Sequence, residues 1–285
     1  MTAALSVPTW LTVVAGISLA LALICALVIA IDVWRRPQPM TVMSVVWPVT
    51  ALFGSVLWLA AYWRWGRAPR PNLHPGPRPD PHPGPTPRTA PSSATMGEMG
   101  AMSMTPMDAK MSMAPGSKPM NMGSSRPFPV SVFLGTCHCG AGCTLADLAV
   151  EWLLFAVPSL LVLGGYPWLF SHNLFAHFVL TFVAAYLVGI TFQYWAITSM
   201  KQLGRRQAWW AAIKADTLSL TSWQVGMYLT MALGQLWLFP AWFGGPVAAN
   251  TALFWLLMQV AMLVGFATAY PMNWFLIRRG IKEQM

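Results

Sequence analysis

Charged residues are scarce in this chain. Asp, Glu, Lys and Arg together make up only 9% of the 285 residues, whereas hydrophobic residues make up 56%. A soluble domain carries about 25% charged residues. A chain with so few charges cannot cover its surface for water, which excludes an ordinary soluble globular protein. The composition predicts an all-α integral membrane protein.

The sequence contains several long apolar runs. A helix needs about 20 apolar residues to cross a hydrocarbon core ~30 Å thick. Six runs reach this length and predict six transmembrane helices, at residues 10–33, 41–63, 146–166, 173–200, 215–240 and 247–277. The first run is too long for a signal-peptide core and lacks a basic start, so it counts as a span.

The spacing of these runs predicts three parts. Residues 1–65 form a two-helix transmembrane hairpin, and residues 129–285 form a four-helix membrane bundle that opens with a Cys/His motif. Residues 66–128 between them are rich first in proline and glycine and then in methionine. They show no hydrophobic period, which is typical of a disordered linker.

Most of the net charge of +9 acts as a topology signal. Lysine and arginine near span ends favour the cytoplasmic side. With six spans and both termini in the cytoplasm, all of the 17 basic residues except Arg35 and Arg36 lie inside. Nucleic-acid binding is excluded because no basic helix or aromatic-interleaved patch accompanies the charge.

Methionines crowd the second half of the linker. Thioethers are soft ligands that favour Cu(I), so the tract predicts a copper-gathering segment; its sulfurs include Met96, Met99, Met102, Met104, Met107, Met111 and Met113. The alternative is a low-complexity linker whose methionines bind nothing. Such tracts suit an oxidising compartment, whereas the predicted topology puts this one in the cytoplasm.

Three of the four cysteines fall within the stretch CHCGAGC. His138, Cys139 and Cys143, joined by Asp147 at the same spacing of four, predict a site for a soft metal, either Cu(I) or Zn²⁺. The glycines at 140 and 142 predict a tight turn that folds these ligands around one ion. The alternatives are buried thiols that act as small hydrophobes, or a disulfide.

Asp147 and Glu151 follow the cysteines into an apolar run. Carboxylates inside a membrane span are costly and are usually functional, so the pair predicts the start of an ion path. Asp147 could instead lie at the membrane interface, where its negative charge interacts favourably with the dipole at the start of a helix. Four polar residues elsewhere are candidate partners for Glu151: His172, His177, Lys214 and Asp216.

Two methionine pairs have helical spacing. Met227 and Met231 lie four apart in the fifth predicted span, and Met258 and Met262 lie four apart in the sixth. Each pair presents two thioethers on one helix face, as a Cu(I) path through hydrocarbon requires. Ordinary core packing is the alternative, because methionine is common packing material.

Several segments resemble a bacterial membrane family known only as a domain of unknown function. The resemblance covers the first 65 residues and the chain from Pro127 onward, through segments such as CHCGAGCTLADLAVEW and KADTLSLTSWQVGMY. The family motif reads T-H-C-G-A-G-C-T-L, which His138, Cys139 and Cys143 match, whereas Cys137 replaces the threonine. The resemblance implies the bacterial inner (cytoplasmic) membrane and a setting of copper and heavy-metal handling; the methionine tract is not part of the pattern.

Together these features predict a membrane protein that handles a soft metal, most simply by Cu(I) transport or delivery. No nucleotide-binding loop is present in the sequence, so transport would be passive or ion-coupled. One alternative is an accessory or assembly subunit of a larger membrane redox complex, or a homo-oligomer. Another is a membrane thiol oxidoreductase, although C-x-C is not the usual C-x-x-C redox spacing.

Overall fold

The structure is a computed structural model, which describes residues 7–36, 38, 40–69, 127–200 and 204–282. These residues are mostly helical and contain no strand. The elements are α1 (Thr9–Arg35), α2 (Met43–Ala61), η1 (Tyr62–Gly66), α3 (Phe128–Ala156), η2 (Pro158–Val162), α4 (Asn173–Met200), α5 (Arg205–Ala232), η3 (Leu233–Leu238), α6 (Phe239–Phe243) and α7 (Ala252–Arg278).

Most of the predicted linker, residues 70–126, lies outside the part of the chain that the structure describes. Residues 1–70 and 124–285 group into one compact unit. The methionine tract, with Met96, Met99, Met102, Met104, Met107, Met111 and Met113, lies outside the described residues. Its predicted role in gathering copper therefore stays a prediction.

Five helices in the described ranges are long and apolar enough to cross a membrane, which indicates a bilayer environment. They are Thr9–Arg35, Met43–Gly66, Phe128–Ala156, Asn173–Thr198 and Ala252–Arg278. Helix α5 is equally long but does not belong to this set, because charged and hydroxyl side chains interrupt its apolar residues. Six transmembrane helices were expected, and five helices of the described ranges meet these criteria of length and composition.

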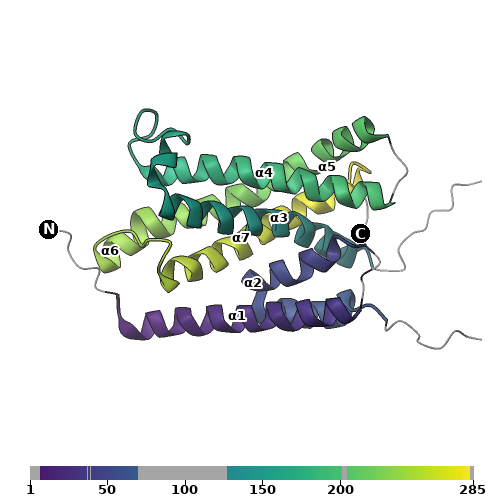
Figure 1. Cartoon of the computed structure of the whole chain (residues 1–285), viewed down its shortest axis with the longest axis horizontal. Coiled ribbons are helices and arrows are strands. Elements are labelled where there is room, and N and C mark those ends of the chain that lie inside the picture. Colours follow the sequence, from purple (N-terminus) through teal and green to yellow (C-terminus); the bar gives the residue numbers. More distant parts are fainter. Residues whose placement is uncertain (1–6, 37, 39, 70–126, 201–203, 283–285) are drawn as a thin grey trace, which may run out of the picture. The chain divides into compact units, whose positions relative to one another are not determined.

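Helix α2 folds back on itself, which corrects the predicted two-helix transmembrane hairpin. Its backbone breaks at Ser55, where φ is 49° and ψ is −131°. The rings of Trp47 and Tyr62 then lie 5.4 Å apart, although 15 residues of continuous helix would separate them by about 22 Å. Both halves of α2 therefore lie side by side (Figure 1), and Met43 and Gly66 are at the same end of the bundle.

A glutamine from α7 stabilises this break. Gln259 Nε2 donates a hydrogen bond of 2.8 Å to the carbonyl oxygen of Leu52, which the break leaves without an intrahelical partner. Its Oε1 accepts a hydrogen bond of 2.8 Å from the Ser18 hydroxyl. One amide thus joins α1, the turn in α2 and α7, and satisfies a backbone group that hydrocarbon would not solvate.

Two sets of contacts orient α1. Near its end, Asp32 accepts hydrogen bonds from Tyr62 (2.9 Å) and Arg67 (3.1 Å), which follow the fold-back. Near its start, Ser18 contacts Gln259 in the first turns of α7. The start of α1 and the end of α7 therefore lie at opposite ends of the bundle. The prediction that both ends of the chain emerge on one side does not agree with this arrangement.

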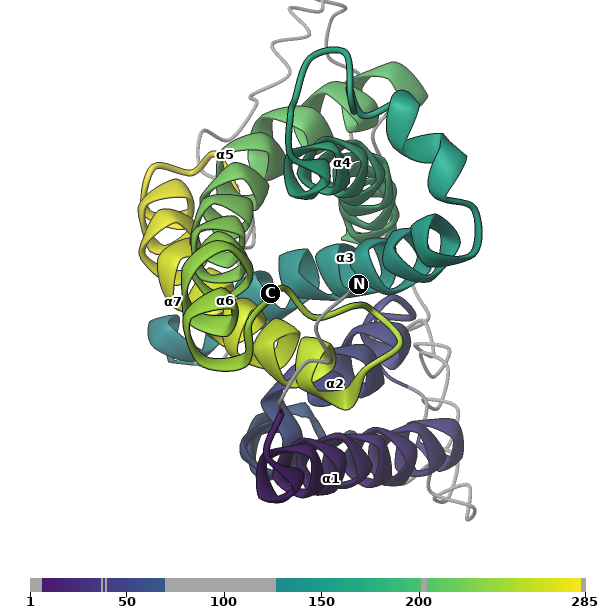
Figure 2. The ribbon, with the colours of Figure 1, turned by 90° about the vertical axis from the view of Figure 1, so that its left-hand side faces the viewer.

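Helices α3, α4, α5 and α7 pack around one another, and α3 lies between α4 on one side and α1 and α2 on the other (Figure 2). Helices α3 and α4 approach closely at Gly142 and Gly189, where a methyl group added to Gly142 would lie 3.1 Å from the Cα atom of Gly189. This contact brings the backbone of α4 against the cysteine stretch of α3.

Candidate functional site

The cysteine stretch lies inside helix α3. Residues 137–143 are helical throughout, so the predicted tight turn at Gly140 and Gly142 was wrong, as was a third span at residues 146–166. The two glycines allow close packing instead: a side chain on Gly140 would collide with the Trp223 indole, and one on Gly142 would press on α4. The motif therefore forms part of the bundle interior and does not open the bundle as a mouth.

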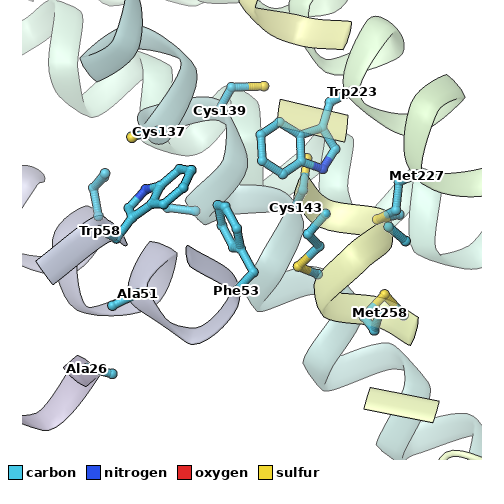
Figure 3. Packing of buried hydrophobic residues seen from close by; sticks show 14 of the residues in the cluster. Ala26, Ala51, Phe53, Trp58, Cys137, Cys139, Cys143, Trp223, Met227 and Met258 are labelled. Atoms are coloured by element: carbon cyan, nitrogen blue, oxygen red, sulfur yellow. The ribbon is translucent and has the colours of Figure 1, made fainter. Parts of the chain in front are cut away.

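The thiols are all buried and free. Cys139 and Cys143 share one face of α3, since they are four residues apart. Cys137 faces elsewhere, next to Trp58, whereas Cys143 lies on the side of Met227 and Met258 (Figure 3). The motif thus directs its sulfurs to two different sides of the helix, and only Cys139 and Cys143 share the interior face of the bundle.

His138 does not join the cysteines on that face. Its ring lies 6.0 Å from the ring of Phe192 on α4, and neither ring nitrogen has a hydrogen-bond partner among the described residues. Within those residues, no three His, Cys, Asp or Glu side chains converge in a way that could hold a metal ion. The predicted set of His138, Cys139, Cys143 and Asp147 is therefore not assembled around one point and stays a prediction.

A cavity of about 390 Å³ opens where α3 ends, α4 begins, α5 ends and α7 begins. Most of the residues predicted for an ion path line it. They come from three helices and are Asp147, Glu151, Met227, Met231 and Met258. His172, His177 and Tyr228 contribute further polar groups. The tertiary structure therefore brings together carboxylates, imidazoles and thioethers that are up to about a hundred residues apart in sequence.

The two carboxylates in the cavity differ in their partners. Glu151 Oε2 lies 3.0 Å from His177 Nδ1, so His177 is the partner that the sequence left open among four candidates. Asp147 is completely buried, and neither carboxylate oxygen has a hydrogen-bond partner in the described structure. A buried carboxylate with no partner is costly unless it binds a proton or a cation. Asp147 is therefore the strongest candidate for a cation ligand.

The thioethers lie in two connected places. Met227, Met231 and Met258 line the main cavity. Met262 instead lines a neighbouring cavity of about 250 Å³, which Met258 also lines, and there the Thr144 hydroxyl donates to its sulfur at 3.5 Å. Met227, Met231 and Met258 thus face the main cavity, whereas Met262 faces the cavity between α1, α2, α3 and α7; Met258 belongs to both.

Hydrogen bonds hold the walls of the main cavity in place. Gln235 donates to the Val247 carbonyl oxygen (3.0 Å) and accepts from the Val247 amide (2.9 Å), which ties the segment between α6 and α7 to η3. Tyr228 donates to the Phe178 carbonyl oxygen (2.9 Å), which ties α5 to α4. The cavity is therefore bounded by fixed backbone segments.

A second buried ionic group lies near the start of α5. Lys282 Nζ is 3.4 Å from Asp216 Oδ1 and 3.4 Å from the Ser219 hydroxyl oxygen. Sequence reasoning considered Asp216 as a partner of Glu151 and missed Lys282. Lys214, the other candidate, is exposed. Nothing in the local pattern identifies this pair, because 66 residues separate its members.

Several buried polar atoms of the bundle have no hydrogen-bond partner among the described residues. Within the described ranges they include atoms of Asp147 and His138 on α3, Gln193 on α4, Asp216 and Gln224 on α5, and Asn273 on α7. Native interiors satisfy most buried polar groups. A series of unsatisfied ones through four packed helices marks a polar interior in an otherwise apolar bundle.

Residues 130–282 match a family described as a domain of unknown function, DUF4396. The chain belongs to this family. The match begins in α3 and therefore includes the cysteine stretch, the cavity and the Asp216–Lys282 pair, whereas α1 and α2 lie outside it. Comparison with curated proteins gives no match. Comparison with solved structures gives none either.

Proposed function

We propose that this protein moves or delivers Cu(I), with the main cavity as its binding chamber. One observation carries the proposal: thioethers of Met227, Met231 and Met258 line the same cavity as the unpartnered carboxylate of Asp147. Soft sulfur ligands favour Cu(I), and a buried carboxylate supplies the negative charge that a cation needs in hydrocarbon. Copper is the cargo in this scheme.

The face of α3 that carries Asp147, Cys143 and Cys139 supplies the onward route for the ion. Cys143 and Cys139 lie one and two helical turns beyond Asp147 on the same face of α3. They act as successive ligands, which replaces the single site predicted from His138, Cys139, Cys143 and Asp147. Glu151 and its partner His177 lie at the cavity, where this route begins. Asp216 lies at the other end of the proposed route.

The distribution of charge supports a topology. Basic residues flank the end of α1, the end of η1, the start of α5 and the end of α7, whereas residues 157–172 and 239–251 contain none. By the positive-inside rule, the basic end faces the cytoplasm of the bacterial inner membrane and the cavity opens on the outer side. Helices α1, α3, α4, α5 and α7 cross the bilayer, and α2 re-enters. The methionine tract then gathers copper on the inner side.

Copper binding and uptake by purified protein in liposomes test the proposal. Replacing Met227, Met231 and Met258 together by leucine conserves volume and removes three soft ligands, so we expect most Cu(I) binding and flux to be lost. Met43→Leu is the matched control, because Met43 is equally buried at the start of α2 and does not line the cavity. Asp147→Asn is expected to reduce binding, and Cys143→Ala to slow flux more than binding.

Two results would contradict the proposal. If the wild-type protein takes up neither Cu(I) nor Zn²⁺, the accessory-subunit alternative becomes the better account. If the triple methionine variant binds copper as the Met43→Leu control does, the thioethers are packing residues and the cavity serves another ligand.

A further inference from the structure

The Lys282–Asp216 pair has the features of an occupied cation site. The Lys282 side chain is completely buried and that of Asp216 is 1% exposed, so both charges lie in the protein interior. Helix α7 ends before Lys282, and a turn at Gly280 (φ 67°) reverses the backbone. The Leu276 carbonyl oxygen accepts hydrogen bonds from the amides of Ile281 (3.0 Å) and Lys282 (3.3 Å). The turn thus directs a charged side chain back into the bundle.

The ammonium group fills its position poorly. Its distances to Asp216 Oδ1 and Ser219 Oγ are both 3.4 Å, whereas a good charge-assisted hydrogen bond measures about 2.7–2.9 Å. Asp216 Oδ2 has no partner among the described residues. A carboxylate oxygen therefore remains available in the described structure.

The surroundings leave room for the second carboxylate oxygen. A methyl group added to Gly189 of α4 would lie 2.9 Å from Asp216 Oδ2, so glycine at this position allows the carboxylate to face α4. The Asp216 carboxylate therefore lies where α5 packs against α4.

We propose that Asp216 and Ser219 form a binding site for a small monovalent cation, which the Lys282 ammonium occupies as a tethered substitute for the free ion. Oxygen ligands are hard and suit Na⁺, K⁺ or a small ammonium ion better than Cu(I). The site is separate from the copper-binding cavity, on a different part of α5. Its existence does not require copper transport, and only its use as the position of a coupling ion depends on the proposed function.

Chemical rescue of Lys282→Ala tests the proposal without copper. The variant keeps Asp216 and Ser219 but leaves the ammonium position open, so we expect a lower thermal midpoint than wild type. Methylammonium or Na⁺ then raises that midpoint relative to N-methylglucamine, a large cation, at equal ionic strength. At several times its dissociation constant, a ligand raises the midpoint of a protein of this size by about 2–4 °C. Wild type, whose site is filled, is expected to show no such difference.

The double variant Asp216→Asn/Lys282→Ala is the matched control. It has lost the carboxylate as well, so we expect no cation-specific shift, and we expect it to be more stable than Lys282→Ala because no unpaired charge stays buried. Lys282→Gln is a second variant, whose side chain has a similar length but no positive charge. Equal midpoints of Lys282→Ala in all three cations, or an equal shift in the double variant, overturns the proposal. So does failure of both single variants to fold in any of these salts.

Discussion

At the scale of single residues, the glycines of the cysteine stretch show how one feature can favour two interpretations. Glycine between reactive side chains favours a turn, and it equally allows close contact between helices. Gly142 serves the second purpose, because a Cβ atom there would lie 3.1 Å from the Cα and 3.3 Å from the amide nitrogen of Gly189. The polar side chains of α3 therefore lie deep in the bundle, against the backbone of α4.

This interpretation predicts opposite effects for two glycines of the same helix. Gly142→Ala forces α3 and α4 apart and is expected to lower the free energy of unfolding by about 1–3 kcal/mol. Gly135→Ala is the control, because its added methyl group would meet only Ile277 Cδ1 at 3.8 Å. Its better helix propensity is expected to stabilise the protein by about 0.5–1 kcal/mol. Thermal unfolding in detergent measures both; equal effects would contradict the close contact.

The individual carboxylates also differ in a way that the sequence does not reveal. Asp147 and Glu151 have the same charge and lie one helical turn apart, yet among the described residues only Glu151 has a partner, with His177 Nδ1 3.0 Å from Glu151 Oε2. The partner comes from the first turns of α4, across the cavity. Asp147 is thus the group available to a cation, and Glu151 is held in place beside it.

At the scale of elements, the fold-back of α2 changes how the N-terminal part relates to a membrane. A straight helix of 24 residues would cross a bilayer. With the break at Ser55, both ends of this segment lie beside the end of α1, where Asp32 bonds to Tyr62 and Arg67. Non-helical backbone at this depth is tolerated because Gln259 satisfies the Leu52 carbonyl oxygen.

Cysteine labelling distinguishes a re-entrant α2 from a crossing one. Thr41 and Pro69 are exposed on either side of the α2–η1 segment, and Thr9 is exposed at the start of α1. We expect a membrane-impermeant maleimide to label Thr41→Cys and Pro69→Cys from the same side and Thr9→Cys from the other. The native cysteines are buried, which keeps the background low. Labelling of positions 41 and 69 from opposite sides would show that α2 crosses the membrane.

At the scale of the whole molecule, the compact unit holds together without the linker. Contacts join α1 and α2 directly to α3 and α7. The ring centroids of Trp65, at the end of η1, and Phe133, in the first turns of α3, lie 5.6 Å apart. The two segments that the linker connects are therefore neighbours. The described ends of the segment are thus held together by contacts of their own.

Deleting residues 71–123 is expected to leave the thermal midpoint of the protein within a degree or so of wild type, because the described residues on either side of the segment contact one another directly. If the methionines gather copper, uptake falls at low copper and recovers at high copper. A variant with the tract's methionines replaced by serine separates the loss of sulfur from the loss of length. A large loss of stability on deletion would show that these residues pack on the bundle.

Composition alone predicts the class of the protein, because scarce charge and long apolar runs favour an all-α membrane fold. The sequence also singled out several residues that line the cavity, among them Asp147, Glu151 and Met227, since intramembrane carboxylates and methionines at helical spacing stand out locally. Only the tertiary structure decided that α2 folds back at Ser55, since a single backbone break leaves hydropathy unchanged. It likewise decided that His177 pairs with Glu151 and Lys282 with Asp216. These pairings depend on how distant helices pack, and residue spacing along the chain does not encode them.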